Sequence, residues 1–126
     1  VLDPVLASTS GAALLTADGV AAMIEHLFPL CTLVTPNLSE AAALTGLEDG
    51  DLAQQGEMLR GFGAGAVLIK GGHGQGPLST DTLFDAHGTL PLSAPRLAAS
   101  RRGTGCTLST ATACFLAAGH DLRQAC

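Results

Sequence analysis

The sequence has 126 residues, of which 47% are hydrophobic and 13% charged, and its net charge at pH 7 is −5. These values indicate one compact domain over residues 1–126 and exclude a disordered chain. An acidic chain with no Trp or Tyr and a single Lys is not expected to bind nucleic acid, which favours a basic face. Its apolar runs are short and interrupted, and Val1–Pro4 show no secretory pattern, so we expect no membrane span and a cytoplasmic protein.

The first part of the chain predicts a strand end, a helix and a second short strand. Val1–Val5 resembles the end of a buried strand running into a turn. Thr32–Thr35 predicts a β-strand that stops at Pro36. A helix that Pro29 closes is predicted by apolar residues at helical spacing: Val20, Met23, Ile24, Leu27 and Phe28.

The middle of the chain predicts two helices and a buried strand. Leu38–Thr45 favours a short Ala-rich helix, with Asn37 or Ser39 as its N-cap and Gly46 as its stop. Asp51–Arg60 predicts a weaker helix. Ala66–Ile69 is entirely apolar, as in strands buried on both faces of a parallel sheet.

The last part predicts a β-hairpin and a long helix. Thr82–Asp85 and Thr89–Leu92 are strand-like runs on either side of a His-Gly turn. Gly103–Cys106 opens an apolar helix that ends near Gly119, and Asp121 is placed to cap a further helix. This alternation predicts an α/β fold with a mostly parallel central sheet, flanking helices and the hairpin at one edge.

Four cysteines are present, but their spacing predicts no metal site. The sequence contains no CxxC pair, so we expect free buried thiols. The cysteines are Cys31, Cys106, Cys114 and Cys126.

Gly103-Thr104-Gly105-Cys106 is the strongest local signal for chemistry. Glycines let successive N–H groups point one way, and the positive end of the helix dipole adds to an anion-binding turn. A thiol at a helix N-terminus has a lowered pKa, so Cys106 is a candidate general base. The alternative is an ordinary Gly turn followed by a small buried residue.

Asn37 and Glu40 lie three residues apart, just after a predicted strand. Ligands bind at the carboxyl ends of strands in open α/β sheets, and an amide with a carboxylate suits a hydrated Mg²⁺ near phosphates. The alternative is a capping box, with Asn37 as N-cap and Glu40 at the third helical position.

Asp3 and Lys70 also follow predicted strands. Asp3 is a further candidate metal ligand, or only a turn former. Lys70, the only Lys, is placed to reach phosphate oxygens, and Gly71 and Gly72 let the backbone approach a nucleotide; the alternative is a solvated Lys in a flexible loop. An anion-binding turn, carboxylates and one Lys at the same sheet edge favour phosphoryl transfer, although no GxxxxGK[ST] motif is present.

The ordered segments LDPV, TPNLSEAAALTG, VLIKGGHG, DTLFD and APRLAASRRGTGCTLSTATA resemble hydroxymethylpyrimidine/phosphomethylpyrimidine kinases. The resemblance covers the whole chain. It implies a ribokinase-like fold, ATP and Mg²⁺ as cofactors, and hydroxymethylpyrimidine or its monophosphate, an intermediate of thiamine biosynthesis, as the small-molecule substrate. A homodimer is implied as well.

The resemblance also assigns roles to residues. Gly103, Thr104, Gly105 and Cys106 form the anion hole and supply the base. Asn37 and Glu40 hold Mg²⁺ and phosphate with Asp3 nearby, and Lys70, Gly71 and Gly72 lie on the nucleotide side, where Asn37 and Thr104 also contribute. These assignments rest on the family's pattern.

Two departures from the family's pattern bear on activity. Arg102 stands where the family commonly has His, and the family's N-terminal half has no counterpart here. We therefore expect little or no kinase activity from this chain alone. The alternatives are a pyridoxal kinase-like enzyme and a non-catalytic nucleotide- or phosphate-binding remnant.

Overall fold

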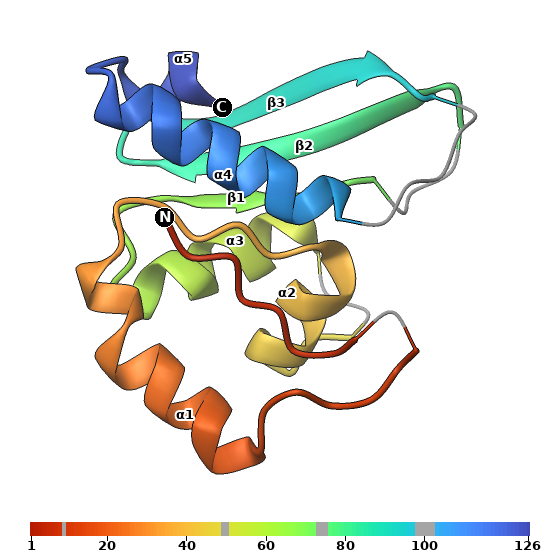
Figure 1. Cartoon of the computed structure of the whole chain (residues 1–126), viewed down its shortest axis with the longest axis vertical. Helices are drawn as coiled ribbons and strands as arrows, with labels where there is room; N and C mark the ends of the chain where they lie inside the picture. Colours follow the sequence, from red (N-terminus) through yellow and green to blue (C-terminus); the bar gives the residue numbers. More distant parts are fainter. Residues whose placement is uncertain (9, 49–50, 73–75, 98–102) are drawn as a thin grey trace.

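The computed structural model describes residues 1–8, 10–48, 51–72, 76–97 and 103–126. A small sheet lies between two groups of helices (Figure 1). In chain order the elements are α1 (Ala17–His26), the 3-10 turn η1 (Phe28–Leu30), α2 (Leu38–Thr45), α3 (Leu52–Gly61), β1 (Val67–Ile69), β2 (Leu78–Asp85), β3 (Gly88–Pro95), α4 (Thr104–Ala117) and α5 (Leu122–Ala125).

The sheet has a parallel part and an antiparallel part. The strands β1, β2 and β3 are antiparallel neighbours in that order, and Leu68 faces Leu83 across the first pair. On the other side of β1, Val34 bridges in parallel to both Leu2 and Val67. The predicted parallel centre and edge hairpin are thus both present. The predicted strand at Thr32–Thr35 contributes only isolated bridges, since Pro36 has no N–H to continue the ladder.

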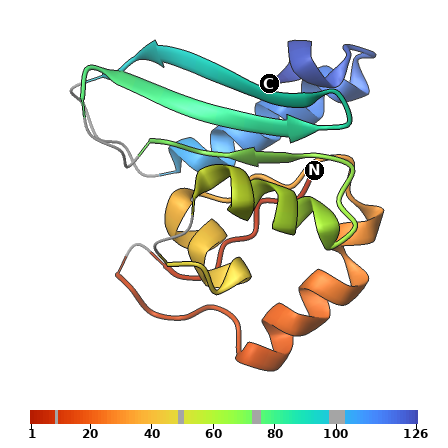
Figure 2. The same ribbon diagram turned by 180° about the vertical axis from the view of Figure 1, so that it is seen from behind.

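Both faces of the sheet are buried at β1 and at the end of β2, as the apolar run before Lys70 predicted, whereas β3 is mostly exposed. On one face Val67, Ile69 and Phe84 pack with apolar residues of α1, α2 and α3. On the other face Leu68 and Leu83 pack with Leu108 of α4, Leu122 of α5 and their neighbours. This alternation follows from the two-residue period of a strand. Seen from behind, the β2–β3 hairpin covers α4 (Figure 2).

The helix predicted to run to Pro29 ends earlier. The helix α1 ends at His26, and Phe28–Leu30 form a separate 3-10 turn with Pro29 inside it. Phe28 is fully buried there and its ring lies 6.2 Å from that of Phe62. Burial of Phe28 follows from this tighter turn, which the apolar spacing alone did not distinguish from one continuous helix.

The predicted helix caps are confirmed. Asn37 caps α2, and Gly46 ends it in the left-handed conformation. Asp121 caps α5 with a side-chain oxygen. Asp51 caps α3 in the same way, a role that was not predicted for it. Gly103 precedes α4 at φ +80°, a conformation that favours glycine.

Across the described residues, the helices are too short or too polar to span a bilayer.

Candidate active site

The polar residues predicted to converge lie where the parallel segments end. Asp3 follows the segment at Leu2, and Asn37 and Lys70 follow the segments at Val34 and β1. Asn37 and Lys70 form a parallel bridge, and the Lys70 backbone N–H donates to the carbonyl of Pro36 at 2.8 Å. The sheet therefore carries these three residues to one edge.

Asp3 and Lys70 form a largely buried ion pair. The Lys70 Nζ lies 2.7 Å from Asp3 Oδ1, and the two side chains are 11% and 15% exposed. Lys70 also faces the first turn of α4, because a Cβ built on Gly105 would lie 3.0 Å from its Nζ. The alternative of a solvated Lys in a flexible loop is wrong: Lys70 is fixed and sits beside the helix N-terminus.

The predicted anion-binding turn at the start of α4 has no side-chain cap. The first N–H groups of a helix have no partner within it, and Gly103 has no side chain to cap them. They lie beside the Lys70 ammonium group, which approaches Gly105. Helix dipole, N–H groups and one cation thus act together on any anion placed there. Arg102, the departure from the family's pattern, lies outside the described residues, as does His73.

Cys106 is exposed at this turn and not buried as expected. The other three cysteines are not buried either, since Cys114 is exposed and Cys31 and Cys126 are half-buried, although all four thiols are free. The predicted low pKa of Cys106 is also wrong. The Asp3 carboxylate raises the pKa of Cys106, first as a hydrogen-bond acceptor for the protonated thiol and then through its charge. Burial raises it further, while the charge of Lys70 opposes the change. The neighbouring carboxylate therefore raises the thiol pKa that the helix terminus was expected to lower.

We predict that Asp3→Asn speeds the alkylation of Cys106 by iodoacetamide. Removing the carboxylate charge lowers the pKa of the thiol, so more thiolate is present at a given pH. The rate is measured across a pH series by mass spectrometry of the peptide that contains Cys106. The control is Glu57→Gln, which removes an exposed carboxylate on α3. Equal rates in Asp3→Asn and wild type would contradict the Asp3–Cys106 contact.

Two hydroxyl groups that the sequence analysis missed join α4 to the sheet. The Oγ1 of Thr35, which is fully buried, lies 2.7 Å from Oγ of Ser109 and 3.4 Å from Asp3 Oδ1. The Ser109 hydroxyl also reaches the Gly105 carbonyl at 3.0 Å. Ser109 lies one helical turn after Gly105, and this spacing was the only signal in the sequence. The pair links the position of the anion-binding turn to Asp3.

Asn37 and Glu40 form the capping box that was the alternative to a metal role. Asn37 Oδ1 accepts from the Glu40 N–H at 2.8 Å, and Glu40 Oε2 accepts from the Asn37 N–H at 2.8 Å. Over the described ranges, no three His, Cys, Asp or Glu side chains gather as metal ligands. Mg²⁺ usually takes one or two carboxylates and completes its shell with phosphate oxygens and water. The side-chain oxygens of Asn37 and Glu40 fit such a magnesium–phosphate complex, but they are too few to bind Mg²⁺ by themselves.

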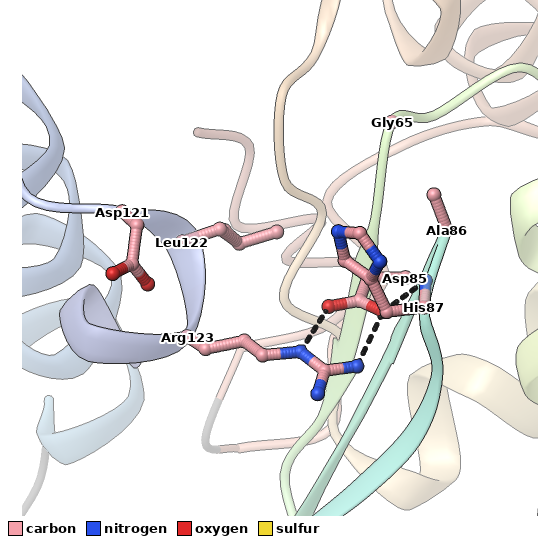
Figure 3. Close-up of a pocket in the computed structure, with 7 residues that line it drawn as sticks. All are labelled: Gly65, Asp85, Ala86, His87, Asp121, Leu122 and Arg123. Atoms are coloured by element: carbon pink, nitrogen blue, oxygen red, sulfur yellow. Dashed lines mark hydrogen bonds and ion pairs between the residues drawn. The ribbon is translucent and has the colours of Figure 1, made fainter.

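A pocket of about 450 Å³ lies at the opposite end of β1. Gly65, the hairpin turn and the start of α5 line it, and Arg123 holds Asp85 there (Figure 3). The Arg123 Nε and Nη2 atoms donate to the two oxygens of Asp85 at 2.7 and 2.8 Å. None of the predicted site residues lines this pocket, so it is separate from the strand ends described above.

The Asp85–Arg123 pair predicts a loss of stability in acid. The hydrogen bonds from Arg123 lower the pKa of Asp85 from 3.8 to about 2. The stability that Asp85 contributes is fully present above its unfolded pKa of 3.8, and it is lost as the pH falls through its folded pKa of about 2. Urea unfolding should therefore show a steeper decline for wild type than for Asp85→Asn over this range. Parallel declines would contradict the prediction, and the Arg60–Glu57 surface pair, altered as Glu57→Gln, provides the control.

Comparison with known proteins places the chain in a family. The family model described as phosphomethylpyrimidine kinase matches residues 1–126. A hydroxymethylpyrimidine/phosphomethylpyrimidine kinase of Rhizobium meliloti is 48% identical over 130 residues, which cover 99% of this chain and 49% of that protein. The Escherichia coli protein of the same name is 43% identical, with 90% of this chain and 44% of that protein covered.

Solved structures agree with this relationship. Pyridoxal kinase from Staphylococcus aureus in complex with ADP superposes with a TM-score of 0.84 at 34% identity, over 98% of this chain and 46% of that one. Phosphomethylpyrimidine kinase from Clostridium difficile superposes with a TM-score of 0.76 at 32% identity, over 98% of this chain and 50% of that one. These likenesses confirm the ribokinase-like α/β fold, and the chain spans about half the length of the curated relatives it matches. Sequence and structure together show that the chain belongs to the phosphomethylpyrimidine kinase family.

Proposed function

We propose that this chain supplies the phosphate-binding side of a single-domain kinase that transfers a phosphoryl group from ATP to hydroxymethylpyrimidine or its monophosphate. The carrying observation is the uncapped start of α4 with the Lys70 Nζ against Gly105. Family membership supports the substrate class. Phosphoryl transfer depends mainly on positioning and on stabilising negative charge, which this arrangement provides.

Each site residue has a role in this proposal. The N–H groups from Gly103 to Cys106 hold the transferred phosphoryl group, and Lys70 adds a cation beside them. Gly71 and Gly72 lie on the nucleotide side, and Thr104 and Asn37 add polar contacts to the phosphates. Cys106, in its thiolate form, is the proposed base that takes the proton of the substrate hydroxyl.

Mg²⁺ belongs to this site as a complex with the nucleotide phosphates, whose charge it neutralises. Asn37 and Glu40 at the start of α2, with Asp3 nearby, would supply its oxygen ligands. Binding of ADP and of AMP-PCP by pyridoxal kinase of Staphylococcus aureus supports a nucleotide site in this fold. From the resemblance to hydroxymethylpyrimidine/phosphomethylpyrimidine kinases we also propose that the protein is a cytoplasmic homodimer.

Isothermal titration with Mg·ATP tests this proposal on the chain itself. Saturable binding is expected, with strong weakening in an Asn37→Ala/Glu40→Ala double variant and a smaller effect of Cys106→Ala, since the thiol acts on the substrate. A folded chain that binds no Mg·ATP would overturn the nucleotide site. Because Asn37 and Glu40 also cap α2, the folded state of the double variant is checked by circular dichroism.

The substrate is tested separately from the nucleotide. A coupled ADP-release assay compares hydroxymethylpyrimidine, its monophosphate and pyridoxal, first with this chain and then with a polypeptide of the relatives' full length that contains it. We expect turnover of the pyrimidines by the longer protein and little by this chain. Pyridoxal is included because its kinases superpose closely, and turnover of pyridoxal alone would favour that activity instead.

A further inference from the structure

The β2–β3 hairpin holds the backbone that follows β1. The Gly71 N–H donates to Asp81 Oδ1 on β2 at 2.8 Å. Gly71 also lies directly against β2, where a Cβ would meet the Thr80 carbonyl oxygen at 1.9 Å. The first residue after Lys70 is therefore fixed by one carboxylate and by contact with the neighbouring backbone.

Arg96, the residue after β3, contacts the same region with its whole guanidinium group. Its Nη1 donates to the carbonyl of Gly72, and Nε and Nη2 donate to the carbonyls of Gly76 and Leu78, both at 3.0 Å. Its backbone N–H donates to the carbonyl of Pro77 at 2.8 Å. A planar fork with several donors can hold these carbonyls at once, whereas a Lys ammonium cannot reproduce that geometry.

The hydrogen bonds of Asp81 and Arg96 hold Gly71 and Gly72, which the proposed function places on the nucleotide side of the site. The Lys70 side chain is fixed by Asp3, and its backbone by Pro36. Among the described contacts of Gly71 and Gly72, the hydrogen bonds from the hairpin are those to Asp81 and Arg96. Within the described part of the chain, no carboxylate pairs with Arg96, so its bonds to carbonyl oxygens account for its placement.

We propose that Asp81 and Arg96 are positioning residues that hold the Gly71–Gly72 backbone in the shape that receives the nucleotide. This inference rests on the proposed function and names the part of the protein that sets the geometry of its nucleotide side. Both residues act through the backbone, so neither needs to touch the nucleotide. The hairpin thereby gains a role beyond completing the sheet edge.

We call the hydrogen bonds of Asp81 and Arg96 to the Gly71–Gly72 backbone the clamp. Amide hydrogen exchange in the chain without ligand tests whether the clamp holds this backbone. We expect Asp81→Ala to speed exchange at Gly71 by about tenfold, the effect of one lost hydrogen bond of about 1.4 kcal/mol. Asp81→Asn keeps an acceptor oxygen and should retain most of the protection. Exchange at Gly71 that is unchanged in Asp81→Ala would overturn the clamp.

Titration with Mg·ATP tests whether the clamp affects nucleotide binding. Arg96→Lys keeps the positive charge but loses the planar set of guanidinium donors, and we expect it to bind Mg·ATP about tenfold more weakly. The matched control is Arg123→Lys, which breaks a similar fork at the opposite end of the sheet and should leave the affinity within about twofold.

The outcomes separate the two proposals. Equal affinity of Arg96→Lys and wild type would overturn the positioning role while the nucleotide site stands. Absence of binding by wild type would overturn the proposed function and with it the nucleotide part of this inference, and the exchange experiment then decides the clamp alone. Weakening by Arg96→Lys but not by Arg123→Lys supports both.

Discussion

Replacing Gly71 by Ala is expected to destabilise the protein by about 3 kcal/mol or more and to abolish Mg·ATP binding. The added methyl group would lie 1.9 Å from the Thr80 carbonyl oxygen, a contact that only movement of the backbone can relieve. Overpacking of this kind typically costs about 1–3 kcal/mol, and here the obstacle is backbone. Such movement also breaks the bond from Gly71 to Asp81. Urea unfolding and calorimetric titration measure the two effects.

The neighbouring glycine provides the control. A Cβ at Gly72 would meet nothing within 4 Å, so Gly72→Ala should change stability by no more than about 0.5 kcal/mol. Both variants add one methyl group to adjacent residues of the same segment. Equal stability of Gly71→Ala and Gly72→Ala would show that the close approach of β2 to Gly71 is incorrect.

Replacing Lys70 by Met is expected to have the second large effect, a loss of about 3 kcal/mol in the free energy of unfolding. The substitution leaves the Asp3 carboxylate largely buried without its cation. Breaking a buried pair costs about 3–5 kcal/mol, and the lower end applies because both side chains keep some contact with water. Affinity for Mg·ATP should fall at least tenfold, since the only cation beside Gly105 in the described structure is removed.

A second substitution separates stability from binding. Adding Asp3→Asn to Lys70→Met removes the orphaned charge and should recover much of the stability but not the nucleotide affinity. Glu57→Gln, at the exposed Arg60–Glu57 pair, serves as the surface control and should cost less than about 1 kcal/mol. A Lys70→Met protein as stable as wild type would contradict the buried ion pair.

The sequence by itself determined the local elements of this protein. Asn37, one of two predicted N-caps, and Asp121 cap helices in the structure, because an N-cap depends only on residues within one turn. Ala66–Ile69 was recognisable as a buried strand from its apolar run, and the hairpin from the His-Gly turn between its strands. The edge at which Asp3, Asn37 and Lys70 meet was also predictable, since each follows a strand.

The tertiary structure alone decided how the site residues interact. Asp3 is separated from Lys70 by 67 residues and Thr35 from Ser109 by 74, so no local pattern encodes either contact. The rule that a helix N-terminus lowers a thiol pKa failed at Cys106 because the Asp3 carboxylate, from the other end of the chain, raises that pKa. Arg96 shows the same dependence, since its role follows from three carbonyl oxygens that only the folded hairpin brings to one guanidinium group. Electrostatic and hydrogen-bond energies depend on distances in space, and those distances exist only after the strands have paired.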